Sequence, residues 1–121
     1  MTDEEIELCC RVSRHPLWVW KEGMLGKQEG GETLRFTGEE DMSTYFPSVS
    51  DALTTYRVWK SFKDLNLKDY AYILSKDGRI YKGGFKRTGG KEVLIYNSYC
   101  EGVVAIRLWL WFANVCLNLN K

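Results

Sequence analysis

The sequence predicts an α+β fold in which an antiparallel sheet, arranged as a meander, has helices packed on both of its faces. Apolar residues alternate on either side of Asp77-Gly78, a dipeptide typical of two-residue hairpin turns. A second hairpin signal follows at Gly89-Gly90, so three successive strands are expected. Three segments with helical spacing of apolar residues supply helices. We therefore expect the order α-β-β-α-β-β-β-α in a single domain, 1–121, because a sheet with two apolar faces needs covers on both.

The first third of the chain predicts a helix and a hairpin. Thr2 begins a capping box, and apolar residues repeat at helical spacing over 3–14. Pro16 disfavours helical geometry at the residue before it, so the helix is expected to end there. Two strands are then expected at 17–20 (LWVW) and 33–36 (TLRF), on either side of a glycine-rich turn.

An acidic loop and a second helix come next. Residues 37–50 are long for a connection without regular structure, so packing or function is expected to order them. Ser50 is a suitable N-cap for a helix over 51–63, with Asp51 favourably placed in the first turn. Three adjacent acids are interpreted as an exposed loop rather than as a catalytic carboxylate pair: Glu39, Glu40 and Asp41.

The Asp77-Gly78 turn predicts the register of the first two strands of the meander. The expected pairs are Leu74 with Tyr81, Tyr72 with Gly83, and Tyr70 with Phe85. One face then collects Tyr70, Tyr72, Leu74, Tyr81 and Phe85, and the other Ala71, Ile73, Ile80 and Lys82.

The third strand is expected to pair Phe85 with Leu94. This register places Tyr96 on the aromatic face and Val93 and Ile95 on the other. Two glycines, Gly83-Gly84, interrupt the middle strand and predict a bulge, with a ligand passing against bare backbone as the alternative.

A last helix is expected to begin at a second capping box, 98–101, and to end at about residue 118. It is apolar on nearly all of its faces. Its apolar run is short for a membrane span and contains Arg107 and Asn114, so membrane insertion is not expected. The sheet and the first helix can cover two of its faces. We expect the third face to contact another copy or a partner protein. That face consists of Trp109, Phe112 and Cys116.

Composition and motifs argue against an enzyme and against a bound metal. The chain has four cysteines and one histidine, His15, without the spacing of a zinc site. It contains no Walker, H-E-x-x-H, G-x-S-x-G or G-x-G-x-x-G pattern. We therefore expect no catalytic residue, no cofactor and no metal. Free thiols and an acidic start unlike a signal peptide predict a cytoplasmic location.

Charge is unevenly distributed although the net charge is +1. Residues 1–56 carry five Lys and Arg against eleven Asp and Glu, whereas residues 57–91 carry ten against three. Basic and aromatic side chains interleave in the second segment, a pattern that holds nucleotides and single strands by ion pairing and stacking. The alternative is that the lysines keep sheet edges soluble and the rings belong to the core. The expected anion- or nucleotide-binding residues are Arg57, Lys60, Tyr72, Arg79, Tyr81, Lys82, Lys86 and Arg87.

Four segments follow one another in a characteristic order. They are MTDEEIELCCRV, the LWVW strand followed by FPSVSDALTTYRVWKSF, the hairpin DGRIYKGGF and the final EGVVAIRLWLW. In this order, and over most of its length, the chain resembles the phage ABA sandwich domain family of small phage and prophage proteins. Trp109, Trp111 and Phe112 depart from the smaller residues expected late in that family's last helix. The resemblance implies an antiparallel sheet between helices and a phage accessory role, and it supplies no active-site residues.

The sequence thus predicts a non-enzymatic phage or prophage accessory protein that counters host defence. It would bind and sequester a host component in the host cytoplasm, either an anionic nucleotide signal or a defence protein. One alternative is a small nucleic-acid-binding module, whose affinity falls steeply with salt. Another is a homo-oligomeric protein–protein interaction domain.

Overall fold

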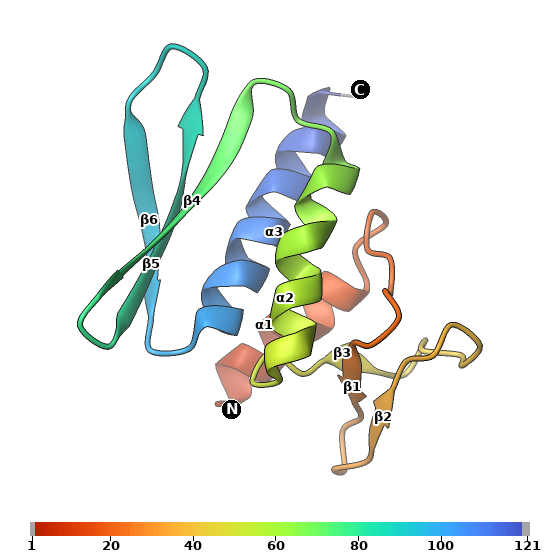
Figure 1. Ribbon diagram of the computed structural model, residues 1–121. Helices are drawn as coiled ribbons and strands as arrows, with labels where there is room; N and C mark the ends of the chain where they lie inside the picture. The colour runs from red at the N-terminus through yellow and green to blue at the C-terminus, as the bar shows by residue number, and fades with distance from the viewer. Residues whose placement is uncertain (1, 120–121) are drawn as a thin grey trace.

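The computed structural model describes residues 2–119, which form three α-helices and two three-stranded antiparallel sheets (Figure 1). The α+β class and the order of the principal elements are as predicted. A short strand, β3, and a 3-10 turn, η1, are additional. The elements are α1 (Asp3–Ser13), β1 (Leu25–Lys27), β2 (Thr33–Arg35), β3 (Phe46–Pro47), α2 (Ala52–Ser61), η1 (Phe62–Leu65), β4 (Tyr70–Asp77), β5 (Ile80–Arg87), β6 (Glu92–Ser98) and α3 (Glu101–Leu119).

Helix α1 begins and ends close to the predicted residues. The Thr2 hydroxyl accepts the backbone N–H of Glu5 at 3.2 Å, as an N-cap should. The helix stops at Ser13, ahead of Pro16. Its buried face consists of Leu8, Cys9 and Val12.

The predicted strand at 17–20 is wrong. The backbone N–H of Trp18 bonds the carbonyl of His15 at 3.0 Å, so the chain turns immediately after α1. The Trp18 ring then packs against Trp109 of α3, with ring centroids 5.1 Å apart. The tryptophans of this segment thus serve core packing instead of a strand face.

The first sheet has the order β2-β1-β3. Its central residue, Gly26, lies opposite Leu34 on one side and Pro47 on the other. The loop 37–50 that leads through β3 is ordered by packing, because it buries Met42, Phe46 and Val49.

The meander β4-β5-β6 has the face membership that the sequence predicts for β4 and β5, but not the predicted pairs. Its first turn is Gly78-Arg79 rather than Asp77-Gly78, and Gly78 has a φ of 61°. Glycine with positive φ at the first turn position is typical of a type II′ turn. Tyr72 therefore pairs with Phe85, two positions further along β5 than predicted. A shift of two residues keeps every side chain on its predicted face.

The predicted bulge is confirmed between Gly83 and Gly84, where the pairing of β5 with β6 changes register. On one side of the bulge, Gly83 pairs with Tyr96, which keeps Tyr96 on its predicted face. On the other side Phe85 pairs with Val93, so the predicted partner Leu94 is wrong and Val93 shares the face of Phe85.

Both bulge glycines are needed because other chain segments approach them closely. A Cβ on Gly83 would collide with Val104 and Leu108 of α3, and a Cβ on Gly84 would collide with the main chain of β6 at Val93. Helix α3 and strand β6 therefore occupy the space that the alternative interpretation assigned to a ligand.

Helix α3 forms the centre of the core, with nine buried residues between Gly102 and Ala113. Trp109 is 1% exposed and Phe112 is 3% exposed. The Trp109 ring meets His15 at 5.4 Å, and the Phe112 ring meets Phe62 at 5.5 Å. The two side chains are thus covered within the monomer and do not offer the exposed surface on which the predicted interface depended.

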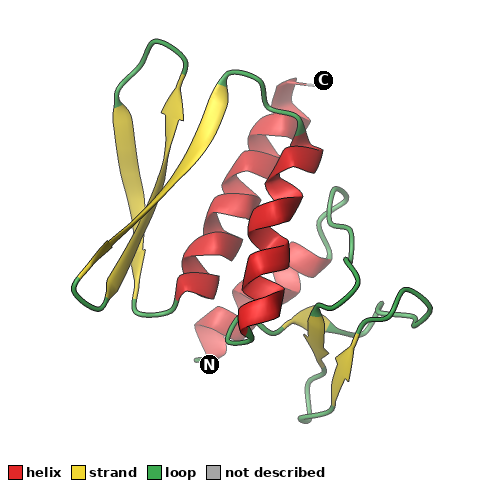
Figure 2. Ribbon diagram, viewed as in Figure 1, coloured by secondary structure: helices red, strands yellow, loops and turns green. Residues whose placement is uncertain are grey.

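The prediction that helices cover both faces of the sheet is wrong. All three helices lie to one side of the meander rather than on both faces (Figure 2). Cys116, the third residue of the predicted interface, is half-buried, and its Sγ lies 3.3 Å from the carbonyl of Leu65. By length and composition α3 also qualifies as a membrane span, as the core helix of a soluble protein does.

Candidate functional site

The basic residues expected to bind an anion are spread over the molecule rather than gathered. Arg79 lies in the exposed β4–β5 turn, and Lys82 near it contacts Asp77 at 3.4 Å. Lys86 and Arg87 lie at the opposite end of β5. Lys86 is seven positions after Arg79 along the extended strand, a separation of roughly 23 Å at 3.3 Å per position.

Two further predicted residues lie on α2. Arg57 and Lys60 both approach the ring of Tyr56, with their charged atoms 5.8 and 5.4 Å from its centroid. The Nε of Arg57 is buried and has no hydrogen-bond partner among the described residues. These contacts form a separate basic–aromatic patch on the helix.

The two predicted stacking residues also occupy different surroundings. Tyr81 lies beneath Lys76, whose Nζ is 4.9 Å from the ring centroid. Tyr72 stacks on Trp59 of α2, with centroids 4.8 Å apart and planes 21° from parallel. Tyr72 lines a pocket that also holds basic residues, and that pocket is the candidate site.

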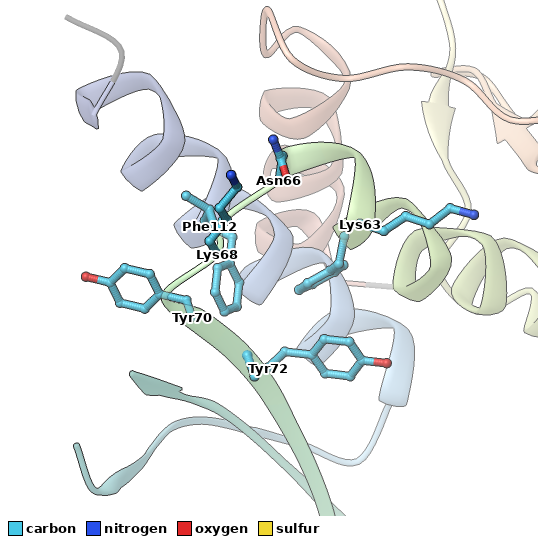
Figure 3. Close-up of a pocket in the computed structure, with 9 residues that line it drawn as sticks. Lys63, Asn66, Lys68, Tyr70, Tyr72 and Phe112 are labelled. Atoms are coloured by element: carbon cyan, nitrogen blue, oxygen red, sulfur yellow. The ribbon is translucent and has the colours of Figure 1, made fainter. Parts of the chain in front are cut away.

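The candidate site is a pocket of about 420 Å³ where β4 leaves η1 and crosses α3 (Figure 3). Four of the nine residues that line it are aromatic. Tyr70 and Tyr72 project from β4 with their hydroxyls pointing in opposite directions, while Phe112 comes from α3. The nine lining residues are Phe62, Lys63, Asn66, Leu67, Lys68, Tyr70, Ala71, Tyr72 and Phe112.

The rim of this pocket is basic. Lys63 and Lys68 both line it, and neither forms an ion pair with the residues that the structure describes. The side chain of Lys63 extends away from the rings (Figure 3). Just beyond the rim, the Arg87 guanidinium lies 5.7 Å from the centroid of Tyr70. Positive charge and aromatic surface therefore meet here.

A left-handed residue shapes the pocket. Asn66 ends η1 with φ 52° and ψ 41°, and its N–H bonds the carbonyl of Lys63. Asparagine tolerates this conformation better than most residues, so it can reverse the chain between α2 and β4. Sequence reasoning missed Asn66 and Lys68 as site residues. The signal that would have found them is the pattern K-D-L-N-L-K, an asparagine helix stop between two lysines.

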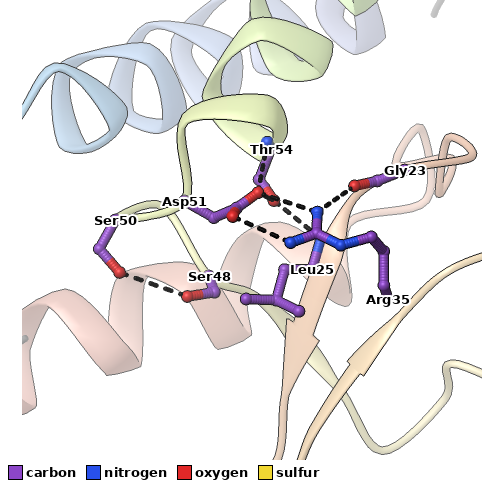
Figure 4. A network of polar contacts seen from close by, with 7 residues as sticks. All are labelled: Gly23, Leu25, Arg35, Ser48, Ser50, Asp51 and Thr54. Carbon is purple, nitrogen blue, oxygen red and sulfur yellow. Dashed lines mark hydrogen bonds and ion pairs between the residues drawn. The ribbon is translucent and has the colours of Figure 1, made fainter.

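A polar network away from the pocket fastens α2 to the first sheet (Figure 4). Arg35 donates to both carboxylate oxygens of Asp51, at 3.2 and 3.1 Å, and to the carbonyl of Gly23. Asp51 also accepts the N–H of Thr54 at 2.9 Å and is the N-cap of α2. The predicted cap, Ser50, is instead paired with the hydroxyl of Ser48.

The Arg35–Asp51 pair alters the ionisation of Asp51. The hydrogen bond from Arg35 holds the pKa of this carboxyl below its ordinary value, against the opposing effect of partial burial. The carboxylate is thus charged at neutral pH and is used for structure.

The groups with nucleophilic or basic potential are likewise engaged in structure. Burial raises the pKa of Cys9 to about 12, so its thiol stays protonated. His15 Nδ1 accepts the N–H of Leu17, which leaves Nε2 to donate to Asn114 at 3.0 Å. Among the residues described, no group of three His, Cys, Asp or Glu side chains is placed to hold a metal ion.

The geometry of the candidate site is that of a binding pocket with an aromatic interior and a basic rim. Comparison with known proteins adds no relative to this description. No protein-family model matches the chain, and no curated protein or solved structure matches it significantly.

Proposed function

We propose that the protein binds a small anionic ligand with an aromatic ring, of the nucleotide class, in the pocket beneath Tyr70 and Tyr72. It would act without catalysis, as a phage or prophage accessory protein that sequesters a host defence signal. The observation that carries the proposal is that one pocket of about 420 Å³ combines aromatic side chains with two lysines that form no ion pair with residues 2–119.

The chemistry of the pocket favours such a ligand for two reasons. Nucleobases stack on tyrosine and phenylalanine, a contact worth about 1–3 kcal/mol per base. Lys68 lines the pocket, the Lys63 side chain extends outward from its edge and Arg87 lies beyond it, so phosphate groups at the rim would meet positive charge. A pocket of this size is also within the usual range for small-molecule sites, about 300–1,000 Å³.

The proposal is tested by isothermal titration with mono-, di- and cyclic nucleotides, using Lys68→Gln as the variant. We expect binding at low salt and a loss of affinity of roughly 10- to 150-fold in the variant, since one charge-assisted contact is worth about 1.5–3 kcal/mol. Arg79→Gln is the matched control, because Arg79 is basic and exposed but lies in the distant turn.

Native mass spectrometry of protein purified from a host with active defence extends the test to unknown ligands. A copurified anion of nucleotide mass supports the proposal. If no nucleotide binds, or if Arg79→Gln weakens binding as much as Lys68→Gln, the pocket is not the site. A gel shift that weakens steeply with salt would favour the nucleic-acid module instead.

A second candidate function, self-association, is favoured by strand β6. This strand lies at the edge of the meander, and no further strand pairs with it among the described residues. Val93, Leu94 and Ile95 are 40%, 48% and 38% exposed, an unusual run for an edge strand. Antiparallel pairing of two copies about Leu94 would put Glu92 opposite Tyr96 of the second copy, so no like charges would meet.

Self-association is tested by analytical ultracentrifugation over a range of concentrations. We expect a dimer that Leu94→Lys converts to a monomer. Leu119→Lys is the control, since Leu119 is 68% exposed at the far end of α3. A wild-type protein that stays monomeric throughout the range would rule out this candidate and leave the ligand-binding proposal unaffected.

A further inference from the structure

A second pocket with aromatic side chains lies where α1 leads into the first sheet. Its charged residues are acidic, whereas those of the first pocket are basic. Its volume is about 310 Å³. Trp18 and Trp20 contribute rings from the turn after α1, and Phe36 contributes a ring from the residue after β2. Glu40 and Asp41, from the loop before β3, are the charged residues that line it.

The three rings stand at angles to one another, so they form a corner. The Trp18 and Trp20 planes are 85° apart with centroids at 5.7 Å, and the Trp20 and Phe36 planes are 52° apart at 6.4 Å. A group placed in such a corner meets the electron-rich face of one ring while touching another. This arrangement attracts cations, because the ring faces carry the negative part of the aromatic quadrupole.

The carboxylates beside the rings are charged and held in place by hydrogen bonds. Glu40 accepts the N–H and the hydroxyl of Thr37, both at 2.6 Å, and Asp41 accepts the N–H of Ser43 at 3.0 Å. These bonds lower the pKa of both carboxyl groups. Neither carboxylate forms an ion pair with a Lys or Arg of residues 2–119, so their negative charge is uncompensated.

We propose that this pocket binds an organic cation, a methylated ammonium group, between the Trp18, Trp20 and Phe36 rings and the Glu40 and Asp41 carboxylates. The cation is either a free quaternary ammonium compound or a methylated lysine on a peptide. The site is independent of the anion pocket, and its occupant has the opposite charge.

The hydrogen bonds of the two acids favour a methylated ammonium over a metal ion or a bare ammonium. Both oxygens of Glu40 already accept hydrogen bonds from Thr37. The carboxylate can therefore attract a cation by its charge, but it is poorly placed to accept a further hydrogen bond. A hard metal ion requires several free oxygen ligands, which two partly engaged carboxylates do not supply. A quaternary ammonium has no N–H to satisfy and is weakly hydrated, so it loses little on contact with aromatic rings.

The part of the ligand that lies outside the pocket separates the two sources of the cation. A peptide can contact the protein surface beyond the pocket through its backbone, whereas tetramethylammonium occupies the pocket alone. Comparing the two ligands therefore separates the sources of the same charged group.

The experiment is a titration monitored by the tryptophan indole N–H signals in NMR. The probes are tetramethylammonium, the neutral branched alcohol neopentyl alcohol as its near-isostere, and a short peptide with trimethyllysine or unmodified lysine. We expect shifts with both methylated cations and none with the neutral isostere at equal concentration. Tighter binding of the trimethyllysine peptide than of tetramethylammonium identifies a peptide as the source, and equal binding identifies a free ammonium compound.

Variants assign the binding to this pocket. Phe36→Leu and Asp41→Asn are each expected to weaken binding roughly 2- to 30-fold, the range of a single cation–π or close charge contact. Glu39→Gln is the matched control, because Glu39 is an adjacent exposed acid that does not line the pocket. Circular dichroism confirms that each variant is folded. Equal binding of the neutral isostere, or equal weakening by Glu39→Gln, overturns the proposal.

Discussion

At the scale of single residues, Asp51 has the strongest structural role of any charged residue described above. It caps α2, accepts both arms of Arg35 and accepts the hydroxyl of Thr54 at 2.9 Å. The same Thr54 hydroxyl accepts the N–H of Leu25 at 2.7 Å, which continues the network into β1. One carboxylate thus holds a helix and a sheet together.

We expect Asp51→Ala to lower the free energy of unfolding by about 1–2 kcal/mol, the loss of an N-cap. Urea denaturation at neutral pH measures the change. Ser50→Ala is the control, because Ser50 is exposed and does not cap the helix. If Ser50→Ala is the more damaging variant, the cap predicted from the sequence is correct and the network of Asp51 is not important.

The same carboxylate predicts a dependence of stability on pH. Its pKa in the folded protein lies below the ordinary value of 3.8, so its contribution is complete above that value and is lost as the pH falls through the lowered one. The difference in unfolding free energy between wild type and Asp51→Ala should therefore narrow in acid. A difference that stays constant from neutral to strongly acidic pH contradicts this.

At the scale of elements, the meander shows which features the sequence predicts well. The alternation of side chains determined the two faces of β4 and β5 correctly, because a register error of two residues leaves every side chain on its face. The exact pairs were wrong, since Asp77-Gly78 and Gly78-Arg79 are both acceptable turns and only tertiary packing selects between them. The glycine pair correctly predicted the bulge.

The bulge provides a test of how β5 fits between its neighbours. We expect Gly84→Ala to destabilise the protein more than most substitutions, by over about 3 kcal/mol, because the added Cβ meets the backbone of β6, which cannot move aside alone. Gly90→Ala, in the next turn, is the control: its Cβ would lie 3.3 Å from the Arg87 carbonyl, a contact that a small shift relieves. Thermal unfolding compares the two. Similar melting temperatures would show that β6 yields locally.

Contacts with helix α3 explain why residues 17–20 (LWVW) form a turn although the sequence predicts a strand. Alternating Leu17, Trp18, Val19 and Trp20 match a strand pattern, yet their surroundings are decided by distant residues. Trp18 packs on Trp109, which is 91 positions away in the sequence. Such a contact is invisible to local periodicity, and it outweighs strand propensity here.

At the scale of the whole molecule, the candidate sites follow from how segments meet. The sequence predicted a basic and aromatic centre, and the structure divides that set between a turn, a strand end and α2. Tyr72 alone of those residues lines the basic aromatic pocket. Lys63 and Lys68 join it because Asn66 reverses the chain, and the acidic loop joins Trp20 and Phe36 because residues 37–50 fold back onto the first sheet. Three-dimensional packing brings these residues together, and the distribution of charge along the sequence does not predict that packing.

The same packing accounts for the apolar composition of helix α3. Helix α3 is surrounded by the meander, α2 and α1, and half of its most apolar 18-residue window is buried inside the protein. Arg107 is half-buried in that helix, and its guanidinium carbon lies 6.0 Å from the centroid of the Tyr96 ring, which gives it an aromatic partner. Helix α3 is apolar on several faces because the meander, α1 and α2 each pack against a different one.

We therefore expect substitutions in α3 to act according to burial rather than according to position in an apolar run. Ile106→Asn should lower the free energy of unfolding by roughly 3–5 kcal/mol, because it removes a fully buried side chain and buries an amide without partners. Leu119→Asn, at a position 68% exposed, should change it by less than about 0.5 kcal/mol. Chemical denaturation measures both, and detergent-phase partitioning of the wild type is the companion experiment. A protein that enters the detergent phase, with both substitutions weakening that partition alike, would identify α3 as a membrane span and would contradict its place in the core.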